Sequence, residues 1–270
     1  MNSPLISLIT VCFNAEGLIN DTLQSAINQT YKNIELVIID GGSKDNTVAE
    51  IKKYETYIGT LISEPDKGIY DAMNKGIKAA KGEWFYFLNT GDAFYNDTVL
   101  EDVFLKRNLN GIDFIYAKMQ SVNEPTGVNY IGGHQVSFKD FYFKYPICHQ
   151  TTFTRKSVFE YMPYLDSSLK IMADNKWQMT FFKHQQNKTL FIDKVVAFYD
   201  IQGASYHKRM KGYREFLGYI GKLLPFHIYL ANVLLYPIIW AKVKFIRTFQ
   251  QTSWFKAYRN LKFKNKKANV

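Results

Sequence analysis

Short, almost wholly apolar runs alternate with stretches of helical periodicity along the first 120 residues of the chain. The apolar runs predict buried strands at residues 6–12, 34–39, 60–62, 84–88 and 114–117. Apolar residues three or four positions apart predict helices at residues 19–27, 47–54, 69–80 and 98–105. Gly82 is expected to end the third of these helices. Apolar strands that alternate with helices indicate an α/β fold, with a mostly parallel central sheet covered by helices on both faces.

Polar side chains follow four of the predicted strands. Asn14 follows the first strand, Asp40 the second, Glu64 and Asp66 the third, and Asp92 the fourth. In open α/β sheets, ligands bind outside the carboxyl ends of the strands, so we expect these side chains to line one crevice. Several carboxylates that converge there would suit a metal ion and a polar ligand.

The familiar phosphate-binding motifs are absent from the sequence. It contains neither G-x-x-x-x-G-K-[ST] nor G-x-G-x-x-G, which argues against an ordinary nucleotide hydrolase or dinucleotide dehydrogenase. Only two cysteines, Cys12 and Cys148, and five histidines without ligand spacing argue against a disulfide-stapled scaffold or a structural zinc site. The phosphates of a bound nucleotide would therefore be neutralised by a cation that a carboxylate holds.

The positive charge of the chain is concentrated at its C-terminal end. The net charge is +10, yet residues 206–270 hold 14 Lys or Arg residues against one acid, Glu215, which leaves residues 1–205 mildly acidic. Basic, aromatic and aliphatic residues together are typical of a segment that lies on an anionic membrane surface, so we expect a membrane partner and no nucleic acid. A helical subdomain packed on the core, with a solvated basic face, is the alternative.

Residues 223–241 carry no formal charge, and this length is just short of a membrane-spanning helix. Pro225 and Pro237 interrupt the stretch and are expected to break or kink a helix. We therefore expect two short interfacial helices, with a single transmembrane helix as the alternative. The predicted organisation is an α/β domain at 1–205 followed by a basic, amphipathic helical tail at 206–270. The N-terminus lacks the pattern of a secretory signal, so we expect a cytoplasmic protein attached peripherally to the inner face of the cell membrane.

Several ordered motifs occupy the first 84 residues. They are S-L-I-T-V-C-F-N at 7–14, I-I-D-G-G-S-K-D-N-T at 38–47, S-E-P-D-K-G-I-Y-D-A-M-N-K-G at 63–76 and K-G-E-W at 81–84. In this order they resemble glycosyltransferase family 2, and the last two are similar to the branch that assembles bacterial polysaccharides and O-antigens. The resemblance covers about residues 5–205. It implies a GT-A fold, which is Rossmann-like, and an inverting transferase that uses a nucleotide-diphosphate sugar.

The resemblance places the nucleotide-sugar site near the ends of the predicted strands. It implies that Asp40 accepts hydrogen bonds from the base, as a carboxylate does from a uracil N–H, and UDP is therefore the favoured nucleotide. The other residues that it assigns to the donor are Thr10, Phe13, Asn14, Asp66, Lys67, Gly68, Tyr70, Asp71, Asn74 and Asn89. For Asp71 the alternative is a solvated residue in the first turn of a helix, favoured by the helix dipole.

The stretch from Asn89 to Asp92 takes the place of the D-x-D metal-binding motif of the family, with an amide instead of the first carboxylate. The resemblance therefore leaves Asp92 as the ligand of a divalent cation, Mg²⁺ or Mn²⁺. One carboxylate and the substrate phosphates can hold such an ion, because Mg²⁺ keeps several water ligands in any case. A turn in which Asp92 caps the following segment is the alternative.

The second half of the chain is expected to carry the acceptor side. His149 and Gln150, in C-H-Q-T-T-F at 148–153, match an acceptor-side segment of the same branch. Asp174, in I-M-A-D-N-K-W at 171–177, takes the place of the catalytic base, which removes the proton of the acceptor hydroxyl. The alternatives are an N-cap of the following helix for Asp174 and a packed or gating residue for His149.

Together these expectations describe a non-processive hexosyltransferase. It would move one sugar from a UDP-hexose or UDP-N-acetylhexosamine to a hydroxyl of a lipid-linked oligosaccharide in capsule or O-antigen assembly. The Q-x-x-R-W motif that processive synthases of the family carry is absent. Two other classes stay open, a non-catalytic membrane-bound scaffold of a polysaccharide assembly complex and a nucleotidyltransferase. The second needs a glycine-rich basic loop after the first strand, which residues 13–17 do not provide.

Overall fold

The computed structural model describes residues 3–123, 128–200, 208–249 and 252. The first part of the chain forms β1 (Ile6–Cys12), α1 (Ile19–Ile27), β2 (Ile34–Asp40), α2 (Thr47–Lys52), β3 (Ile58–Ser63), α3 (Ile69–Ala79), β4 (Trp84–Phe87), β5 (Ala93–Phe94) and α4 (Val99–Phe104). The second part forms β6 (Phe114–Asn123), β7 (Val128–Gly132), β8 (Thr152–Arg155), α5 (Val158–Tyr161), α6 (Ala173–Gln185), β9 (Thr189–Asp200), α8 (Arg209–Leu223) and α9 (Phe226–Phe249). Short 3-10 helices are η1 (Glu55–Tyr57), η3 (Phe138–Tyr142), η4 (His149–Thr151) and η5 (Gln186–Lys188). The predicted alternation of strands and helices is confirmed.

The strands form one sheet in the order β3-β2-β1-β4-β8-β6-β9-β5, with β7 paired to β6. The four strands from β3 to β4 run parallel, as the apolar runs predict. Each antiparallel pairing among the described residues includes β7, β8 or β9. The α/β class and the mostly parallel sheet are therefore confirmed. β9 pairs parallel with β6, so β5, β7 and β8 are the strands that run in the opposite direction, and the sequence pattern left these three unassigned.

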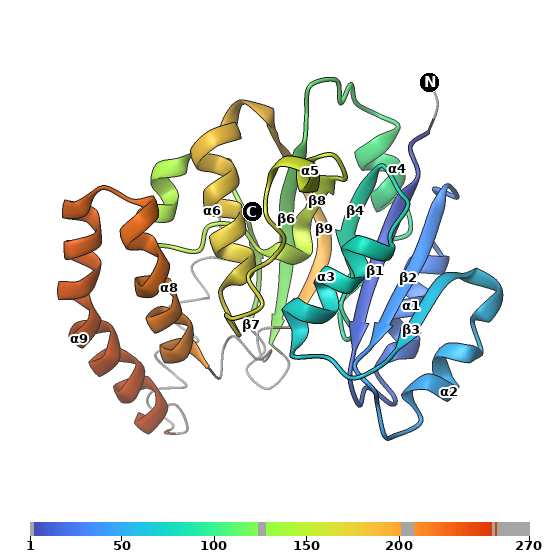
Figure 1. Ribbon diagram of the computed structural model, residues 1–270, viewed down its shortest axis with the longest axis horizontal. Helices are drawn as coiled ribbons and strands as arrows, with labels where there is room; N and C mark the ends of the chain where they lie inside the picture. The colour runs from blue at the N-terminus through green and yellow to red at the C-terminus, as the bar shows by residue number, and fades with distance from the viewer. Residues whose placement is uncertain (1–2, 124–127, 201–207, 250–251, 253–270) are drawn as a thin grey trace.

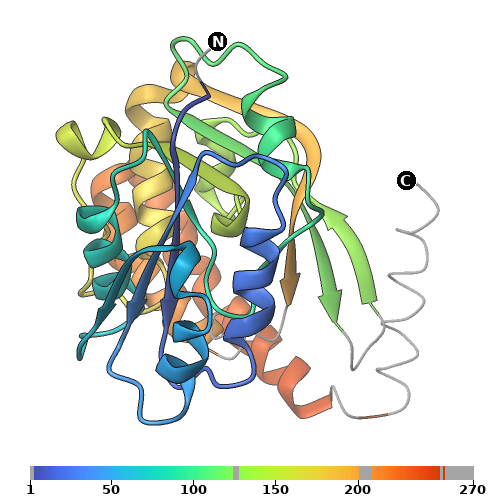
Figure 2. The ribbon, with the colours of Figure 1, turned by 90° about the vertical axis from the view of Figure 1, so that its right-hand side faces the viewer.

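Helices cover both faces of this sheet (Figure 1). Alternate side chains of β1 point to opposite faces, as in any strand. Ile9 and Val11 join a hydrophobic cluster with α3, α6 and α8, whereas Leu8 and Cys12 join a second cluster with α1 and α4. Figure 2 shows α3 and α6 on one side of the sheet and α1 and α4 on the other. The sheet is thus buried on both faces, and this explains why its strands read as continuous apolar runs.

Gly82 does not end α3. The helix ends at Ala79, and Ala80 already has an extended backbone with ψ of 137°. A Cβ on Gly82 would lie 2.7 Å from the Ser7 backbone nitrogen and 2.8 Å from the Leu5 carbonyl oxygen. The expectation of a C-terminal glycine cap is therefore wrong, because this glycine is needed where the chain passes close to β1.

The C-terminal region forms two helices of unequal burial. Phe216 and Ile220 of α8 are buried in the same cluster as α6, whereas α9 lies outside α8 (Figure 1). Pro225 separates α8 from α9, but Pro237 lies inside α9 and does not end it. The expectation of two short helices within residues 223–241 is therefore wrong, because one helix of 24 residues begins at Phe226 and continues through Pro237. The predicted boundary at residue 205 lies outside the described residues. The first helix of the predicted tail is nevertheless packed into the core of the body.

Candidate functional site

The carboxyl ends of β1, β2 and β3 lie side by side because the three strands are parallel. Cys12 pairs with Asp40, and Asp40 pairs with Ser63. Thr10, two residues before the end of β1, is buried. We call this row of strand ends, with the turn that follows β2, the strand-end site. It lies where ligands of open α/β sheets bind.

The Asp40 carboxylate is buried and holds the turn that follows β2. It accepts hydrogen bonds from the backbone N–H groups of Gly42 at 3.2 Å and Ser43 at 3.1 Å, and from the hydroxyls of Ser43 and, at 2.6 Å, Ser63. Burial raises the pKa of Asp40, but these hydrogen bonds outweigh burial and hold the pKa below its usual value. Asp40 is thus an ionised group that organises the turn, and its contact with a base stays a prediction.

An exposed aromatic ring and a second carboxylate flank the same turn. Phe13 is 60% exposed, and a Cβ on Gly41 would lie 2.5 Å from Asp66 Oδ2 and 3.3 Å from the Phe13 ring. The missing side chain of Gly41 therefore lets ring and carboxylate approach one stretch of backbone. Asn14, with φ of 47°, accepts a hydrogen bond from the Lys44 N–H at 2.9 Å. Phe13, Asn14 and Asp66 consequently surround the turn after β2.

Two carboxylates fix the chain as it enters α3. The Gly68 N–H donates to Asp66 Oδ1 at 2.7 Å, and the Lys67 N–H donates to Asp71 Oδ2 at 3.0 Å. Asp71 lies in the first turn of the helix, where the dipole favours a negative charge. Its helix-start role, the alternative considered above, is therefore present, and a role toward the donor stays a prediction.

Asn74 uses its side chain to hold a distant loop. Its Nδ2 donates to the Leu165 carbonyl at 2.7 Å, and its Oδ1 accepts from the Leu165 N–H at 3.0 Å. The two bonds tie α3 to the segment that leads toward α6. This contact gives Asn74 a structural role, which the sequence did not predict.

A cavity of about 700 Å³ lies beside the loop that follows β4. Its volume is in the range of sites that bind small molecules. Six of the predicted site residues line it: Tyr70, Asn89, Asp92, His149, Gln150 and Asp174. The other predicted residues are not part of this lining: Thr10, Phe13, Asn14, Asp40, Asp66, Lys67, Gly68, Asp71 and Asn74. The structure thus divides the predicted residues between this cavity and the segments from β1 to α3.

Asp174 stands at the wall of the cavity and is held from two sides. The Tyr70 hydroxyl donates to Asp174 Oδ1 at 2.8 Å, and His149 Nδ1 lies 3.3 Å from Asp174 Oδ2. The other ring nitrogen of His149, Nε2, lies 3.0 Å from Asn89 Nδ2. We call these four residues the Asp174 cluster. They come from α3, the loop after β4, η4 and α6, and the Asp174 side chain keeps 22% of its surface exposed.

The contacts within the cluster decide the charge of Asp174. Burial raises its pKa, but the hydrogen bonds from His149 and Tyr70 outweigh burial and hold the pKa below its usual value. Burial lowers the pKa of His149, but the hydrogen bond and the charge of Asp174 outweigh burial and raise it. An ionised carboxylate in a fixed orientation at a cavity wall can accept a proton from a bound hydroxyl group.

Asp174 is not the N-cap of α6. The helix begins at Ala173 with Met172 at the N-cap, and Asp174 lies inside the first turn. The alternative reading of Asp174 as an N-cap is therefore wrong. Its carboxylate still benefits from the positive end of the helix dipole.

The loop from Asn89 to Asp92 carries the candidate cation ligand. Gln150 Nε2 lies 3.5 Å from Asp92 Oδ1, and the buried Asn89 Oδ1 has no hydrogen-bond partner among the described residues. The described part of the chain contains no group of three or more His, Cys, Asp or Glu side chains that could hold a metal. One carboxylate with nearby amide oxygens does fit a hard cation that takes its other ligands from phosphate and water.

Lys170 also lines the cavity, and the sequence did not predict it. Its Nζ donates to the Lys67 carbonyl at 2.8 Å and lies 3.5 Å from the position of a Cβ on Gly68. A lysine in an irregular segment belongs to no motif. Only the packing of the segment before α6 against the start of α3 brings its charge to this place.

The comparisons with known proteins agree on the family. The model of "Glycosyl transferase family 2" matches residues 7–163. A "PGL/p-HBAD biosynthesis glycosyltransferase" of Mycobacterium bovis is 28% identical over 204 residues, which cover 74% of this chain and 78% of the relative. The match covers the strand-end site and all residues of the Asp174 cluster except Asp174, which lies beyond residue 163.

Two solved structures share the fold. TarS 1–349 of S. aureus, in complex with UDP-GlcNAc, has a TM-score of 0.61 at 20% identity over 79% of this chain and 64% of that chain. The chain spans only 39% of the longer TarS structure. The mannosyltransferase PcManGT from Pyrobaculum calidifontis, in complex with GDP-Man and Mn²⁺, has a TM-score of 0.65 at 16% identity over 92% of this chain and 76% of that chain. Both likenesses bear on the fold alone, and they confirm the expected GT-A architecture.

Proposed function

The chain belongs to glycosyl transferase family 2, and on this premise we propose that it is a non-processive, inverting enzyme that moves one sugar from a nucleotide-diphosphate sugar to a hydroxyl acceptor. The observation that carries the proposal is the Asp174 cluster, which holds an ionised carboxylate at the wall of a cavity that Asp92 also lines. Members of the family are glycosyltransferases, so the alternatives of a non-catalytic scaffold and of a nucleotidyltransferase lose their support.

We propose UDP as the nucleotide of the donor, carrying a hexose or an N-acetylhexosamine. Phe13 offers an exposed ring next to the turn that Asp40 organises, and an aromatic ring can stack on a nucleobase. TarS is described in complex with UDP-GlcNAc, whereas PcManGT is described with GDP-Man, so the fold accommodates both nucleotides. UDP is favoured here because a carboxylate such as Asp40 can accept a hydrogen bond from the N–H of uracil. Asp40 is buried, so this contact requires the hydroxyl of Ser43 or Ser63 to release the carboxylate when the base binds.

The proposed reaction is a single in-line displacement. Asp174 takes the proton of the acceptor hydroxyl while that oxygen forms its bond to the anomeric carbon and the bond to the diphosphate breaks on the opposite face. Tyr70 and His149 keep the carboxylate in one orientation. Asp92 would hold the divalent cation, Mg²⁺ or Mn²⁺, which when bound would neutralise charge on the departing diphosphate. The Lys170 ammonium would add positive charge to the same cavity.

The acceptor that we propose is a lipid-linked saccharide at the inner face of the cell membrane. On α9, the side chains of Phe226, Leu234 and Ile238 are 74%, 66% and 64% exposed, and their spacing places them along one side of the helix. The segment Phe226–Ile246 is long and apolar enough to cross a membrane, by length and composition only. We propose that it lies on the surface instead, because α9 packs along α8.

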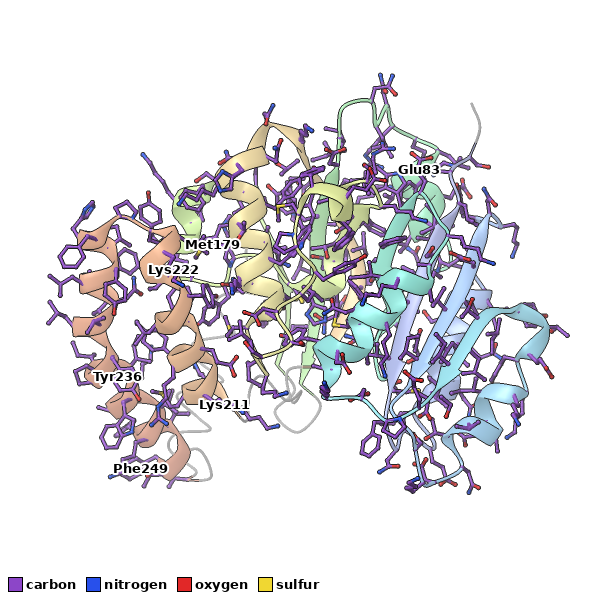
Figure 3. The ribbon with its side chains drawn as sticks, viewed as in Figure 1. Glu83, Met179, Lys211, Lys222, Tyr236 and Phe249 are labelled. Carbon is purple, nitrogen blue, oxygen red and sulfur yellow. The ribbon has the colours of Figure 1, made fainter. Side chains whose placement is uncertain are left out.

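Positive charge accompanies this apolar helix. Lys211 and Lys222 lie near the two ends of α8, the helix along which α9 packs (Figure 3). Lys244 of α9 stands over the Trp240 ring at 5.1 Å from its centroid. Lysines next to exposed aromatic and aliphatic side chains suit a surface of anionic lipid.

The donor proposal is tested by release of nucleotide from a panel of UDP-, GDP- and dTDP-sugars, with Mg²⁺, Mn²⁺ or EDTA. We expect metal-dependent release from UDP-sugars by the wild-type enzyme and its loss in Asp92→Ala. Asp21→Asn is the matched control, because Asp21 is an exposed carboxylate on α1. Release that persists in EDTA and in Asp92→Ala would contradict the role of Asp92.

The membrane proposal is tested by sedimentation with phosphatidylcholine vesicles, with and without phosphatidylglycerol. A Leu234→Glu, Ile238→Glu double variant should bind anionic vesicles about tenfold more weakly, because two apolar side chains no longer enter the interface. Leu105→Glu is the control, since Leu105 is 51% exposed at the end of α4. Equal binding by all three proteins would contradict the proposal. Release of wild-type protein from cell membranes by high salt would separate surface attachment from a spanning helix.

A further inference from the structure

One carboxylate of α8 holds the backbone that leads into α6. Glu215 Oε1 accepts a hydrogen bond from the Lys170 N–H at 3.0 Å, and Oε2 accepts from the N–H groups of Ile171 at 2.9 Å and Met172 at 3.1 Å. Met172 is the N-cap of α6, and Asp174 follows two residues later. Three successive amides immediately before the candidate base therefore converge on a single side chain from another helix.

Glu215 stabilises the start of α6 from another helix, because the segment itself provides no side-chain cap. A helix start is normally stabilised by a polar side chain at the N-cap, but the side chain of Met172 makes no such hydrogen bond. The Glu215 carboxylate supplies charge-assisted hydrogen bonds to this segment, and such bonds are stronger than bonds between neutral groups. Its negative charge also lies beside the positive end of the α6 dipole.

Two further contacts fix the same face of α8 against the same segment. One turn after Glu215, the Tyr219 hydroxyl donates to Asn175 Oδ1 at 2.6 Å. One turn before it, a Cβ on Gly212 would lie 3.1 Å from Ile171 Cγ2 and 3.3 Å from Met172 Sδ, so the α8 backbone lies close against these two side chains. Contacts one turn apart along α8 thus bracket the position of Asp174.

We propose that Glu215 is a positioning residue for Asp174. Glu215 is the one acidic residue among residues 206–270, and it is not part of the lining of the cavity, so it acts through the backbone of residues 170–172. Holding this backbone sets the distance of the Asp174 carboxylate from an acceptor hydroxyl. Small displacements of a reacting group cost a large share of the rate. The inference rests on the proposed role of Asp174 as the base.

The test compares Glu215→Gln with Arg214→Gln in the full chain. Glutamine keeps the size of the side chain but replaces one acceptor oxygen by an N–H donor. Arg214 is the neighbouring exposed residue, whose guanidinium binds the Tyr236 hydroxyl of α9 at 3.0 Å, so its variant disturbs α8 without touching residues 170–172. For each variant we measure amide hydrogen exchange, the binding of UDP by calorimetry, and the kcat and KM of nucleotide release from the UDP-sugar.

For Glu215→Gln we expect about tenfold faster exchange of the amides of residues 170–172, and a fall in kcat of about tenfold or more. The dissociation constant for UDP should stay within about twofold, because the strand-end site is untouched and the Lys170 ammonium keeps its own hydrogen bond to the Lys67 carbonyl. Arg214→Gln should match the wild type in all three. Unchanged exchange or unchanged kcat in Glu215→Gln overturns the inference, as does a loss of UDP binding equal to the loss of kcat.

Tyr219→Phe decides the matter if Glu215→Gln does not fold. It removes one hydroxyl and leaves the ring in the core, and a fall in kcat of about threefold with unchanged UDP binding supports the inference. An unchanged kcat overturns it. Failure of the proposed function is recognised separately, because then the wild-type enzyme itself would release no nucleotide from any sugar of the panel. In that case hydrogen exchange still tests the contact between Glu215 and residues 170–172.

Discussion

The strand-end site and the Asp174 cluster both rely on an ionised aspartate, but the chain builds them in different ways. Asp40 is held by Ser43, three residues away, and by Ser63, 23 residues away. Asp174 is held by Tyr70, 104 residues away, and His149 of the same cluster contacts Asn89 across 60 residues. The first site is therefore a property of one local supersecondary unit, and the second is a property of the whole fold.

The two carboxylates also differ in what they leave free for a ligand. Asp40 is fully buried, and its oxygens accept four or more hydrogen bonds from the turn after β2 and from Ser63. Asp174 accepts from Tyr70 on one oxygen and from His149 on the other, and its side chain keeps 22% of its surface exposed at the wall of the cavity. We infer a division of labour in which the strand-end site shapes the place of the nucleotide, and the Asp174 cluster performs the chemistry.

The largest expected effect is that of Asp174→Asn on sugar transfer. The rate should fall about 10³-fold, because an amide cannot take the acceptor proton. UDP binding, measured by calorimetry, should be unchanged within about twofold, since the strand-end site stays intact.

The matched control for this variant is Asp166→Asn. It removes an ion pair of 2.6 Å to Lys176, which lies on the same helix as Asp174. This control should transfer sugar at close to the wild-type rate. If Asp174→Asn transferred sugar as fast as this control, a residue other than Asp174 would be the base.

Asp40→Ala should act mainly on stability and on binding of the donor. The change leaves the hydroxyls of Ser43 and Ser63 without their acceptor, and we expect a loss of about 2–3 kcal/mol in the free energy of unfolding. Ser63→Ala removes only one donor and should cost about 1 kcal/mol. Urea unfolding measures both. Equal stability of the two variants would mean that Asp40 does not organise the turn.

His149→Gln should change how stability depends on pH. The pKa of His149 is raised by Asp174 in the folded protein, so its stabilising contribution is fully present below the unfolded value of about 6.5 and is lost as the pH rises through the folded pKa. The wild type should therefore exceed the variant in stability by more at about pH 6 than at about pH 9. Urea unfolding at both pH values measures this, and a difference that grows toward high pH is the opposite result.

Local patterns predicted the ends of the strands well for a physical reason. Strands that are buried on both faces must be apolar, so the ends of β1, β2 and β4 could be predicted to within one or two residues. The polar residues at these strand ends could be located in the same way. Resemblance to a family supplied Asp174 and His149, which no spacing marks. The prediction for Gly82 was wrong because a close approach to β1, visible only in the fold, decides that position.

Residues that act through long-range packing could not be predicted. Lys170 lies in the cavity wall and Glu215 lies behind it, because α8 packs against the segment before α6. Neither residue belongs to a motif. Glu215 did carry a weak signal, as the one acid in a strongly basic region.

The proposed reaction is an inverting transfer in which one carboxylate, Asp174, serves as the base. The most direct test is the anomeric configuration of the new glycosidic bond, read by NMR on the product that the wild-type enzyme forms from its UDP-sugar. We expect the configuration opposite to that of the donor. A product with the configuration of the donor would contradict it, because a single displacement on the face opposite the diphosphate cannot retain the configuration.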